Sequence, residues 1–289
     1  MFRTPWLVGC SPTTATRLQS DSRMGPLAPL LDSHCHLLPG LDDGPADWAE
    51  SIEMARCAVA DGIGGVIATP HQFGAYAGNT PNCIRQLTGE LQRCLDAEGV
   101  PLQVFPGAEV RVEPDLARRV RTGEAVTLAD RGRHVLVELP HEIYVPLEKT
   151  LDGLRRAGLV AVLAHPERNL GLRRQPAVLQ SLARRGCHLQ VTAGSLLGKF
   201  GAGVQQFAEQ LVGSGMVQVV ATDGHGIRGR RPLLAAAYQY IAQRWGETAA
   251  ARLCSENPTW IVEGSELLSV SPEASRSPWG SWFRWRAAG

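Results

Sequence analysis

Histidines and carboxylates recur in this sequence directly after short apolar runs. The segment LLDSHCHLLPGLDDG, residues 30–44, holds two histidines and then two adjacent aspartates. Later runs end in residues of the same kinds: His71, Glu109, Glu138, His165, Asp223 and His225. Imidazole mixed with carboxylate is typical of ligands to Zn, Mn or Fe, and several carboxylates could bridge two or more ions. These residue types indicate a hydrolytic site with more than one metal.

The spacing of these residues supports a shared site. In an H-x-H pattern on a strand, His34 and His36 point to the same face and can bind one metal. Asp223 and His225 repeat that spacing. Cys35 lies between the two histidines, so we expect it to point away and not to be a ligand.

Three other histidines do not fit the pattern. His134 begins an apolar run and should lie at the opposite end of its strand. His188 falls inside a run and is interpreted as a core residue, and His141 is expected at the rim of the site. The remaining five of the eight histidines all follow apolar runs, which chance scatter would not produce.

The cysteines argue against other chemistries. There are seven, an odd number, and no C-x-x-C pair occurs. A disulfide framework or zinc ribbon is therefore disfavoured, and reduced thiols in a cytosol are the simpler interpretation. No cysteine is followed six residues later by arginine, so the phosphate-binding loop of a thiol phosphatase is absent from the sequence.

The composition is that of an ordinary soluble protein. The 289 residues are 44% hydrophobic and 20% charged, enough for one large α/β domain or two small ones. The net charge is +1, which does not indicate a nucleic-acid partner. No apolar run approaches the roughly 18 residues that a membrane span requires.

The elements that would position the site alternate along the chain. Seven apolar runs read as strands, near residues 30–36, 64–69, 102–107, 134–140, 159–165, 187–192 and 216–222. Helical periodicity lies between them, over 45–61, 81–98, 146–157, 174–185, 203–214 and 231–245. This alternation predicts a (β/α) barrel of about seven strands, with the site at their carboxyl ends. An open doubly wound sheet is the alternative, although neither glycine-rich nucleotide motif is present.

Three segments are predicted. Residues 1–28 are expected to be a disordered or non-native extension, with Met24 as an alternative start. Residues 29–265 would form the catalytic domain. Residues 266–289, with three Trp and three Arg, are expected to be a flexible tail. A segment that docks a partner or a membrane surface is the alternative for this tail.

Several motifs together resemble one known family. The segments DSHCHLLPGLDDG, SIEMARCAVADGI, IATPH, PGAEVR, LVELP, AHPERN, ATDGH and ENP occur in order between Leu31 and Glu263. They resemble the bacterial PHP-domain protein-tyrosine phosphatases of capsular and exopolysaccharide systems. The resemblance implies a distorted (β/α)7 barrel of the PHP type. It also implies up to three divalent ions, usually Mn²⁺, with Fe, Zn, Co or Mg as alternatives.

The resemblance also implies a role for each site residue. One metal would be bound by His34, His36, Glu109 and Asp223. Glu109 would bridge to a second metal, held also by Glu138 and His165. The third would be bound by Asp43, His71 and His225. Asp42 is the less expected ligand of the adjacent aspartates.

Two arginines would bind the phosphoryl group by the same resemblance. Arg168 lies in HPERN, and Arg230 matches the spacing after the D-x-H motif, with Arg231 as its alternative. Gln72 stands where the family often has a second histidine, and TDGHG replaces its usual SDAHN. These departures touch no primary ligand and affect the expected substrate preference more than the activity.

The leading functional hypothesis is hydrolysis of a phosphomonoester by water activated at paired metals. By resemblance, the substrate would be protein phosphotyrosine, such as the tail of a bacterial tyrosine kinase that controls polysaccharide export, in the cytoplasm. The oligomeric state is left open. Alternatives are a small-molecule phosphatase of the histidinol-phosphate type, an amidohydrolase-like enzyme, or an inactive binding module. An amidohydrolase commonly needs a carboxylated lysine at the fourth strand, where this chain has Glu138.

Overall fold

The computed structural model describes residues 29–270; the predicted extension 1–28 and residues 271–289 of the predicted tail lie outside them. These described residues contain nine short strands, and every paired strand runs parallel to its neighbour. Their bounds are β1 Leu30–Cys35, β2 Ile63–Ala68, β3 His71–Gln72, β4 Gln103–Pro106, β5 Glu109–Arg111, β6 His134–Glu138, β7 Val160–Ala164, β8 His188–Thr192 and β9 Val219–Ala221.

The strands form two hydrogen-bonded sheets, in the orders β1-β2-β4 and β3-β5-β6-β7-β8-β9. β3 follows β2 after a break at Pro70, which has no N–H to donate to a ladder, and it lies outside the predicted run 64–69. β5 follows β4 in the same way and lies outside the predicted run 102–107. If each of these pairs is counted as one strand, the number is the predicted seven.

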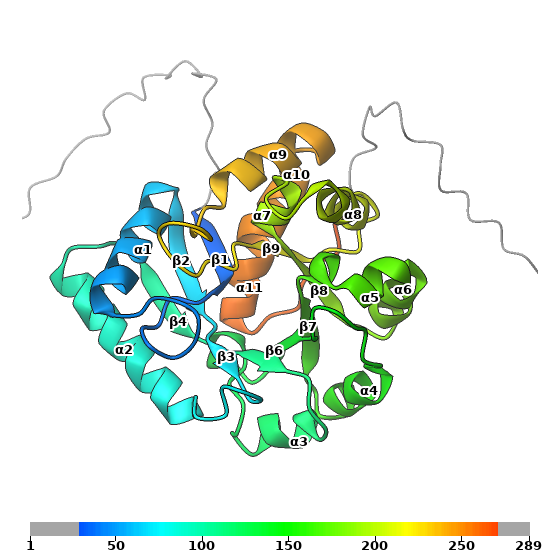
Figure 1. The fold of residues 1–289 in the computed structure, drawn as a ribbon, viewed down its shortest axis with the longest axis horizontal. Helices are drawn as coiled ribbons and strands as arrows, with labels where there is room; N and C mark the ends of the chain where they lie inside the picture. The colour runs from blue at the N-terminus through cyan, green and yellow to red at the C-terminus, as the bar shows by residue number, and fades with distance from the viewer. Residues whose placement is uncertain (1–28, 271–289) are drawn as a thin grey trace, which may run out of the picture.

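The two ends of the strand series meet beyond β9. The amide of Asp223 donates to the carbonyl of His34 at 2.8 Å, and the amide of His36 donates to the carbonyl of Gly224 at 2.8 Å. The strands thus ring a common centre (Figure 1). The fold is the predicted distorted (β/α)7 barrel.

Helices surround this ring of strands (Figure 1). Six of them match the predicted helical segments to within a few residues: α1 Trp48–Ala60, α2 Pro81–Ala97, α4 Glu148–Arg156, α6 Pro176–Arg184, α8 Ala202–Gly213 and α9 Ala235–Trp245. The short elements were not predicted: α3 Leu116–Arg121, η1 Leu128–Asp130, η2 Pro166–Arg168, α5 Leu170–Arg174, α7 Ala193–Leu196, α10 Glu247–Ala251, η3 Arg252–Glu256 and α11 Asn257–Glu263. The first five are too short to show a helical period, whereas α10, η3 and α11 follow one another without a gap over 247–263 and were missed.

Local chemistry explains where the first two long helices begin. The Asp47 side chain accepts the Glu50 amide at 2.9 Å and caps α1. Thr80 caps α2 in the same way, and Pro81 occupies its first turn, where no N–H is needed. The helices then bury one apolar face against the strands.

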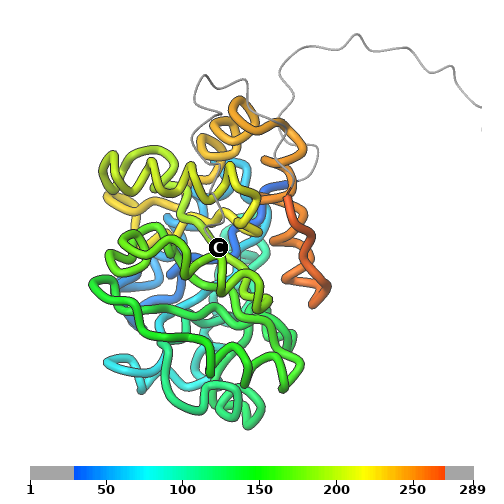
Figure 2. Tube along the Cα trace, turned by 90° about the vertical axis from the view of Figure 1, so that its right-hand side faces the viewer, coloured from blue at the N-terminus to red at the C-terminus, as the bar shows by residue number. Residues whose placement is uncertain are grey.

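The core has two parts. One lies between strands and helices, and the other fills the inside of the barrel with residues such as Leu31, Ile67, Leu136 and Val162. Ile261 of α11 belongs to this inner cluster. α11 lies behind the strands in Figure 1 and at one side of the molecule in Figure 2, so it covers one end of the barrel.

Two residues of the segment 266–289 that fall within the described range are packed. Leu267 and Val270 are buried, and the Leu268 amide donates to the Asn257 side chain at 3.0 Å. The predicted boundary between domain and tail stays a prediction. No helix among residues 29–270 is long and apolar enough to cross a membrane.

Candidate metal centre

All nine predicted ligand residues converge at the carboxyl ends of the strands, opposite α11. His34 lies in β1 and His36 directly after it, while His71 and Glu109 begin the short strands β3 and β5 that follow β2 and β4. The remaining five lie at the ends of strands or in the loops after them. Five of the nine are buried, namely His34, His36, Glu109, His165 and Asp223. The structure therefore brings together every residue that the motif spacing selected.

The deepest part of the cluster joins β1, β5 and the end of β9. The Nε2 atoms of His34 and His36 lie 3.3 Å apart, so both rings point to the same face as predicted. Glu109 Oε2 lies 3.4 Å from each of these nitrogens. Asp223 Oδ1 lies 3.4 Å from His34 Nε2 and 3.6 Å from His36 Nε2. Four potential ligand atoms thus face one small volume.

A second part of the cluster is centred on Glu109. His165 Nε2 lies 2.8 Å from Glu109 Oε1, and His71 Nδ1 lies 3.1 Å from Glu109 Oε2. Glu138 Oε2 approaches His71 Nδ1 at 3.6 Å. Burial lowers the pKa of His165 to about 4, which keeps its imidazole neutral. A neutral imidazole is the form that can donate a lone pair to a metal.

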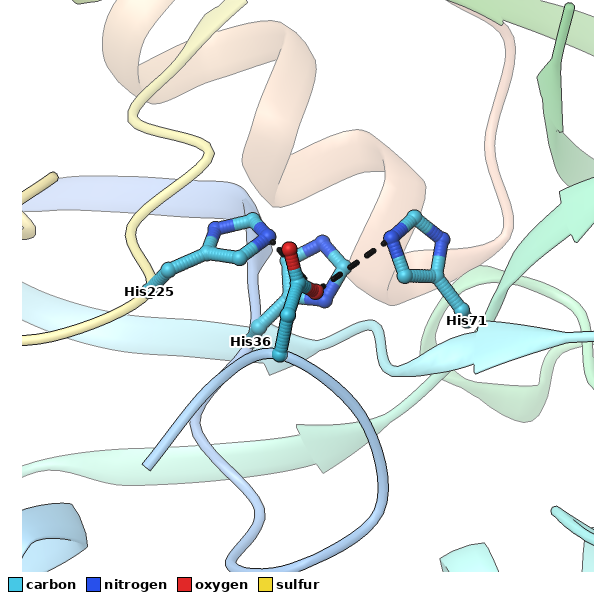
Figure 3. Close-up of side chains that lie close together, drawn as sticks. His36, His71 and His225 are labelled. Carbon is cyan, nitrogen blue, oxygen red and sulfur yellow. Dashed lines mark ion pairs between the residues drawn. The ribbon is translucent and has the colours of Figure 1, made fainter. Parts of the chain in front are cut away.

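The third part lies nearest to solvent. Asp43 Oδ1 is 3.2 Å from His225 Nε2 and 3.5 Å from His71 Nε2, and Asp43 is 54% exposed. Hydrogen bonds from His225 and His71 hold the pKa of Asp43 well below its usual range. Figure 3 shows the rings of His36, His71 and His225 gathered around a carboxylate.

Four overlapping groups of these residues have ligand atoms close enough to hold an ion. They are His36 with Asp43, His71 and His225; His34 with His36 and Asp223; His34 with Glu109 and His165; and His71 with Glu109 and Glu138. In the three-metal assignment, by contrast, Glu138 belongs with His165 and His71 serves only the third metal. The grouping differs because both ring nitrogens of His71 face carboxylates.

The cluster has the chemistry of a cation site. Glu109 Oε2 and Asp223 Oδ1 are buried, and among the described residues they have only imidazole nitrogens at 3.1–3.6 Å, none placed for a well-aligned hydrogen bond. A buried carboxylate oxygen without a partner is costly, and a cation between the two would satisfy both. Burial lowers the pKa of His71, but hydrogen bonds to Asp43 and Glu109 outweigh it and raise the pKa to about 11. A proton there partly offsets the excess negative charge that a metal would neutralise.

Two residues outside the predicted ligand set orient the first histidines. Asp42 Oδ2 lies 2.6 Å from His36 Nδ1 and also accepts the His71 amide at 2.9 Å. Gln190 Oε1 lies 2.9 Å from His34 Nδ1. These contacts leave both Nε2 atoms facing the cluster, the usual arrangement behind metal-binding histidines. The sequence analysis considered Asp42 only as a metal ligand and did not predict that it orients His36. Gln190 was not predicted at all, although a single glutamine in an apolar strand indicates a buried polar contact.

The two predicted phosphate-binding arginines lie beside the cluster. Arg168 Nη1 donates to Asp223 Oδ2, and Arg230 Nη2 pairs with the same oxygen. The Arg168 guanidinium also lies over the Phe200 ring, 4.6 Å from its centre. Arg231 instead contacts Cys57 Sγ at 3.2 Å, outside the cluster, so the geometry favours Arg230.

Backbone conformation marks two of the candidate ligands. His165 and Asp223 adopt left-handed backbone angles, with φ of 33° and 52°. Such angles are unfavourable for residues with a Cβ and tend to persist at functional sites. Both residues end a strand at a sharp turn, which places their side chains over the barrel opening.

The cysteine and the three histidines that were predicted not to bind metal do not belong to the cluster of candidate ligands. Cys35 is buried, its thiol donates to the Gly224 carbonyl at 3.6 Å, and burial raises the pKa of this thiol. His134 and His188 lie at the start of their strands, with ring centres 6.3 Å apart. His188 was expected in the core inside a strand, but it is the first residue of β8 and is only partly buried. His141 is an exposed rim residue, 5.4 Å from the ring of His165. A further rim residue, Tyr76, stacks on His71 with 5.0 Å between ring centres.

A distorted (β/α)7 barrel with histidines and carboxylates gathered at its strand ends defines a class, the barrel hydrolases that use divalent metals. A family model described as capsular polysaccharide synthesis, CpsB/CapC, matches residues 30–263. The chain belongs to this CpsB/CapC family.

Named relatives agree with this family. Tyrosine-protein phosphatase YwqE of Bacillus subtilis (strain 168) is 37% identical over 255 residues, which cover 86% of this chain and 95% of YwqE. Tyrosine-protein phosphatase CpsB of Streptococcus pneumoniae is 25% identical over 239 residues, covering 81% of this chain and 98% of CpsB. A solved structure from work on YwqE and CpsB, described as metal-dependent tyrosine phosphatases, matches with a TM-score of 0.79 and 33% identity. That match covers 84% of this chain and 98% of the other.

Proposed function

We propose that this protein is a metal-dependent phosphomonoester hydrolase that removes phosphate from phosphotyrosine in proteins. The observation that carries the proposal is the pair of buried carboxylates Glu109 and Asp223, whose inner oxygens face imidazole nitrogens without a well-aligned hydrogen bond and lie beside two arginines. The likeness to relatives named tyrosine-protein phosphatases supports the choice of substrate. A thiol nucleophile is disfavoured because burial raises the pKa of Cys35.

Each residue has a task in this reaction. His34, His36, Asp43, His71, Glu109, Glu138, His165, Asp223 and His225 would hold up to three divalent ions. Ions bound there would supply Lewis-acid chemistry, which activates water near neutral pH and neutralises phosphoryl charge. Arg168 and Arg230 would bind the phosphoryl oxygens, and Asp223 holds both guanidinium groups in place beforehand.

The finer assignments are Mn²⁺ as the activating ion and a bacterial tyrosine kinase as the protein substrate. Mixed imidazole and carboxylate ligands suit Mn²⁺, although they also suit Fe and Zn. We propose a cytoplasmic location, supported by the six cysteines among residues 29–270, all of which are free thiols.

One comparison of substrates tests the proposal. The purified protein with Mn²⁺ is given a phosphotyrosine peptide, a phosphoserine peptide, histidinol phosphate and an N-acyl substrate. We expect release of phosphate from the phosphotyrosine peptide at the highest kcat/KM, and loss of that activity with a chelator. Preference for histidinol phosphate would shift the assignment to a small-molecule phosphatase. No release from any phosphoester would contradict the proposal.

A further inference from the structure

A large cavity opens beside the metal centre. Its volume is about 710 Å³, and it lies between α1 and the loop 225–230. Two of its lining residues, His225 and Arg230, also belong to the metal centre and its arginine pair. The cavity therefore adjoins, at His225 and Arg230, the place where a phosphoryl group would bind. Its opposite wall is formed by Ala49, Glu50 and Glu53 of α1.

The acidic residues of the α1 wall already have partners. Glu50 Oε2 accepts the Ala46 amide at 3.0 Å, while the Glu50 amide donates to Asp47, so Glu50 completes the cap of the helix. Glu53 pairs with Arg56 on the next turn. Neither carboxylate is free of an interaction within the fold.

The loop wall is different. Arg228 lines the cavity, is exposed, and forms no ion pair or side-chain hydrogen bond with any residue in 29–270. Ile227 beside it keeps 39% of its surface exposed although it is a large apolar residue. The loop thus presents a free cation and an apolar side chain to the cavity, two residues from Arg230.

We propose that this cavity binds the polypeptide segment next to the phosphotyrosine, and that Arg228 selects segments with an acidic residue there. This inference rests on the proposed function. A small aryl phosphate would occupy only the metal centre, whereas a protein substrate must continue beyond it. The cavity adjoins the centre at Arg230, and a carboxylate in the substrate can pair with Arg228 without displacing any contact of the fold. Ile227 would contact the apolar part of the same segment.

The test compares wild-type protein with Arg228→Gln, both loaded with Mn²⁺. The substrates are p-nitrophenyl phosphate, a phosphotyrosine peptide with glutamates next to the phosphotyrosine, and the same peptide with glutamines. We expect the wild type to prefer the glutamate peptide through a lower KM. Arg228→Gln should remove this preference, with a loss of roughly three- to tenfold in kcat/KM for that peptide alone. Hydrolysis of p-nitrophenyl phosphate should not change.

Two further variants sharpen the result. Arg174→Gln removes an exposed arginine of α5 and should change none of the three rates. Arg228→Glu should turn the preference toward a peptide with lysines in place of the glutamates. An equal fall for all substrates in Arg228→Gln would place Arg228 in the phosphate site and overturn the inference. If the wild type hydrolysed the glutamate and glutamine peptides equally well, the inference would also be overturned. The proposed function would still stand as long as both phosphotyrosine peptides are hydrolysed.

Discussion

The Glu109 carboxylate lies among four imidazole rings. His34 and His36 each approach Oε2 at 3.4 Å, His71 approaches Oε2 at 3.1 Å, and His165 approaches Oε1 at 2.8 Å. A carboxylate with neighbours on both oxygens is suited to bridge two cations. At the scale of single residues, the site therefore depends on one side chain that approaches four of the eight other candidate ligands.

His165 is the residue whose loss we expect to be most informative. His165→Ala should abolish phosphatase activity, because it removes a neutral imidazole from the Glu109 group. The fold should remain intact, as judged by circular dichroism and thermal unfolding.

Cys35→Ser is the matched control for a thiol mechanism and should keep most of the activity. It also alters a buried residue of the β1 end, so its stability is measured in parallel. An inactive but folded Cys35→Ser would contradict hydrolysis by metal-activated water.

Asp42 is predicted to act through His36. Its carboxylate lies 2.6 Å from His36 Nδ1, so Asp42→Asn should weaken the orientation and basicity of that ring. We expect metal affinity to fall by roughly 10- to 100-fold, measured by calorimetric titration of the metal-free protein. Asp47→Asn on the same loop keeps a good helix cap and should leave the affinity unchanged. Equal affinities for the two variants would contradict the role of Asp42.

At the scale of elements, the two ends of the barrel have opposite chemistry. α11 and the inner cluster of Leu31, Ile67 and Ile261 fill one end with apolar side chains. The other end carries the buried carboxylates and imidazoles. The apolar end supplies packing and so allows the site end to bury polar groups that packing alone would not favour.

His134 gives the apolar end a sensitivity to acid. Burial, with smaller contributions from nearby His188 and Arg133, lowers its pKa to about 3. The unfolded chain binds a proton below about pH 6.5. Because folding lowers the pKa of His134, the full free energy of unfolding is present above pH 6.5. Part of it is lost as the pH falls from 6.5 toward 3, since only the unfolded chain then binds the proton. At pH 5 the free energy of unfolding is lower by about 2 kcal/mol because of His134.

His134→Leu should therefore reduce the acid sensitivity. Neither nitrogen of the buried His134 ring has a hydrogen-bond partner among the described residues, so a leucine there leaves no polar atom newly unpaired. Urea unfolding of the metal-free proteins at pH 7.5 and pH 5 measures the effect. The stability of the variant relative to wild type should rise by about 2 kcal/mol between the two pH values. A difference independent of pH would show that His134 binds its proton equally in the folded and unfolded states, so that its pKa is not lowered by folding.

At the scale of the whole molecule, charge is unevenly placed. The chain has a net charge of only +1, yet four carboxylates of the candidate metal centre lie together. Their mutual repulsion opposes folding unless cations or protons bind among them. Burial and the nearby charge of Glu109 raise the pKa of Glu138 to about 7. Metal binding should thus be linked to global stability.

Removal of the metal should lower both activity and the melting temperature. An ion at 100 times its Kd stabilises the folded state by about 2.7 kcal/mol, which is roughly 5–10 °C for a domain of this size. Calorimetry of the chelated protein, before and after Mn²⁺ is added back, measures the shift. Full activity in chelator together with an unchanged melting temperature would contradict the metal centre.

Much of the fold was predictable because strands and long helices leave periodic patterns. The seven strand runs and the six long helices are local features, and they appear where the pattern indicates. The break at Pro70 and the short helix α11 were not predicted. α11 is the last part of a continuous helical stretch over 247–263, and its place depends on the barrel end that it covers, which is built from residues far away in the sequence.

The sequence by itself determined which residues could meet. The period of a strand puts His34 and His36 on one face, and parallel strands bring their carboxyl ends to one side. Only the tertiary structure decided how they meet: Glu109 at the centre, Asp42 behind His36, and Gln190 behind His34. Spacing along one strand sets directions, whereas contacts between strands depend on register and packing, which no local pattern encodes.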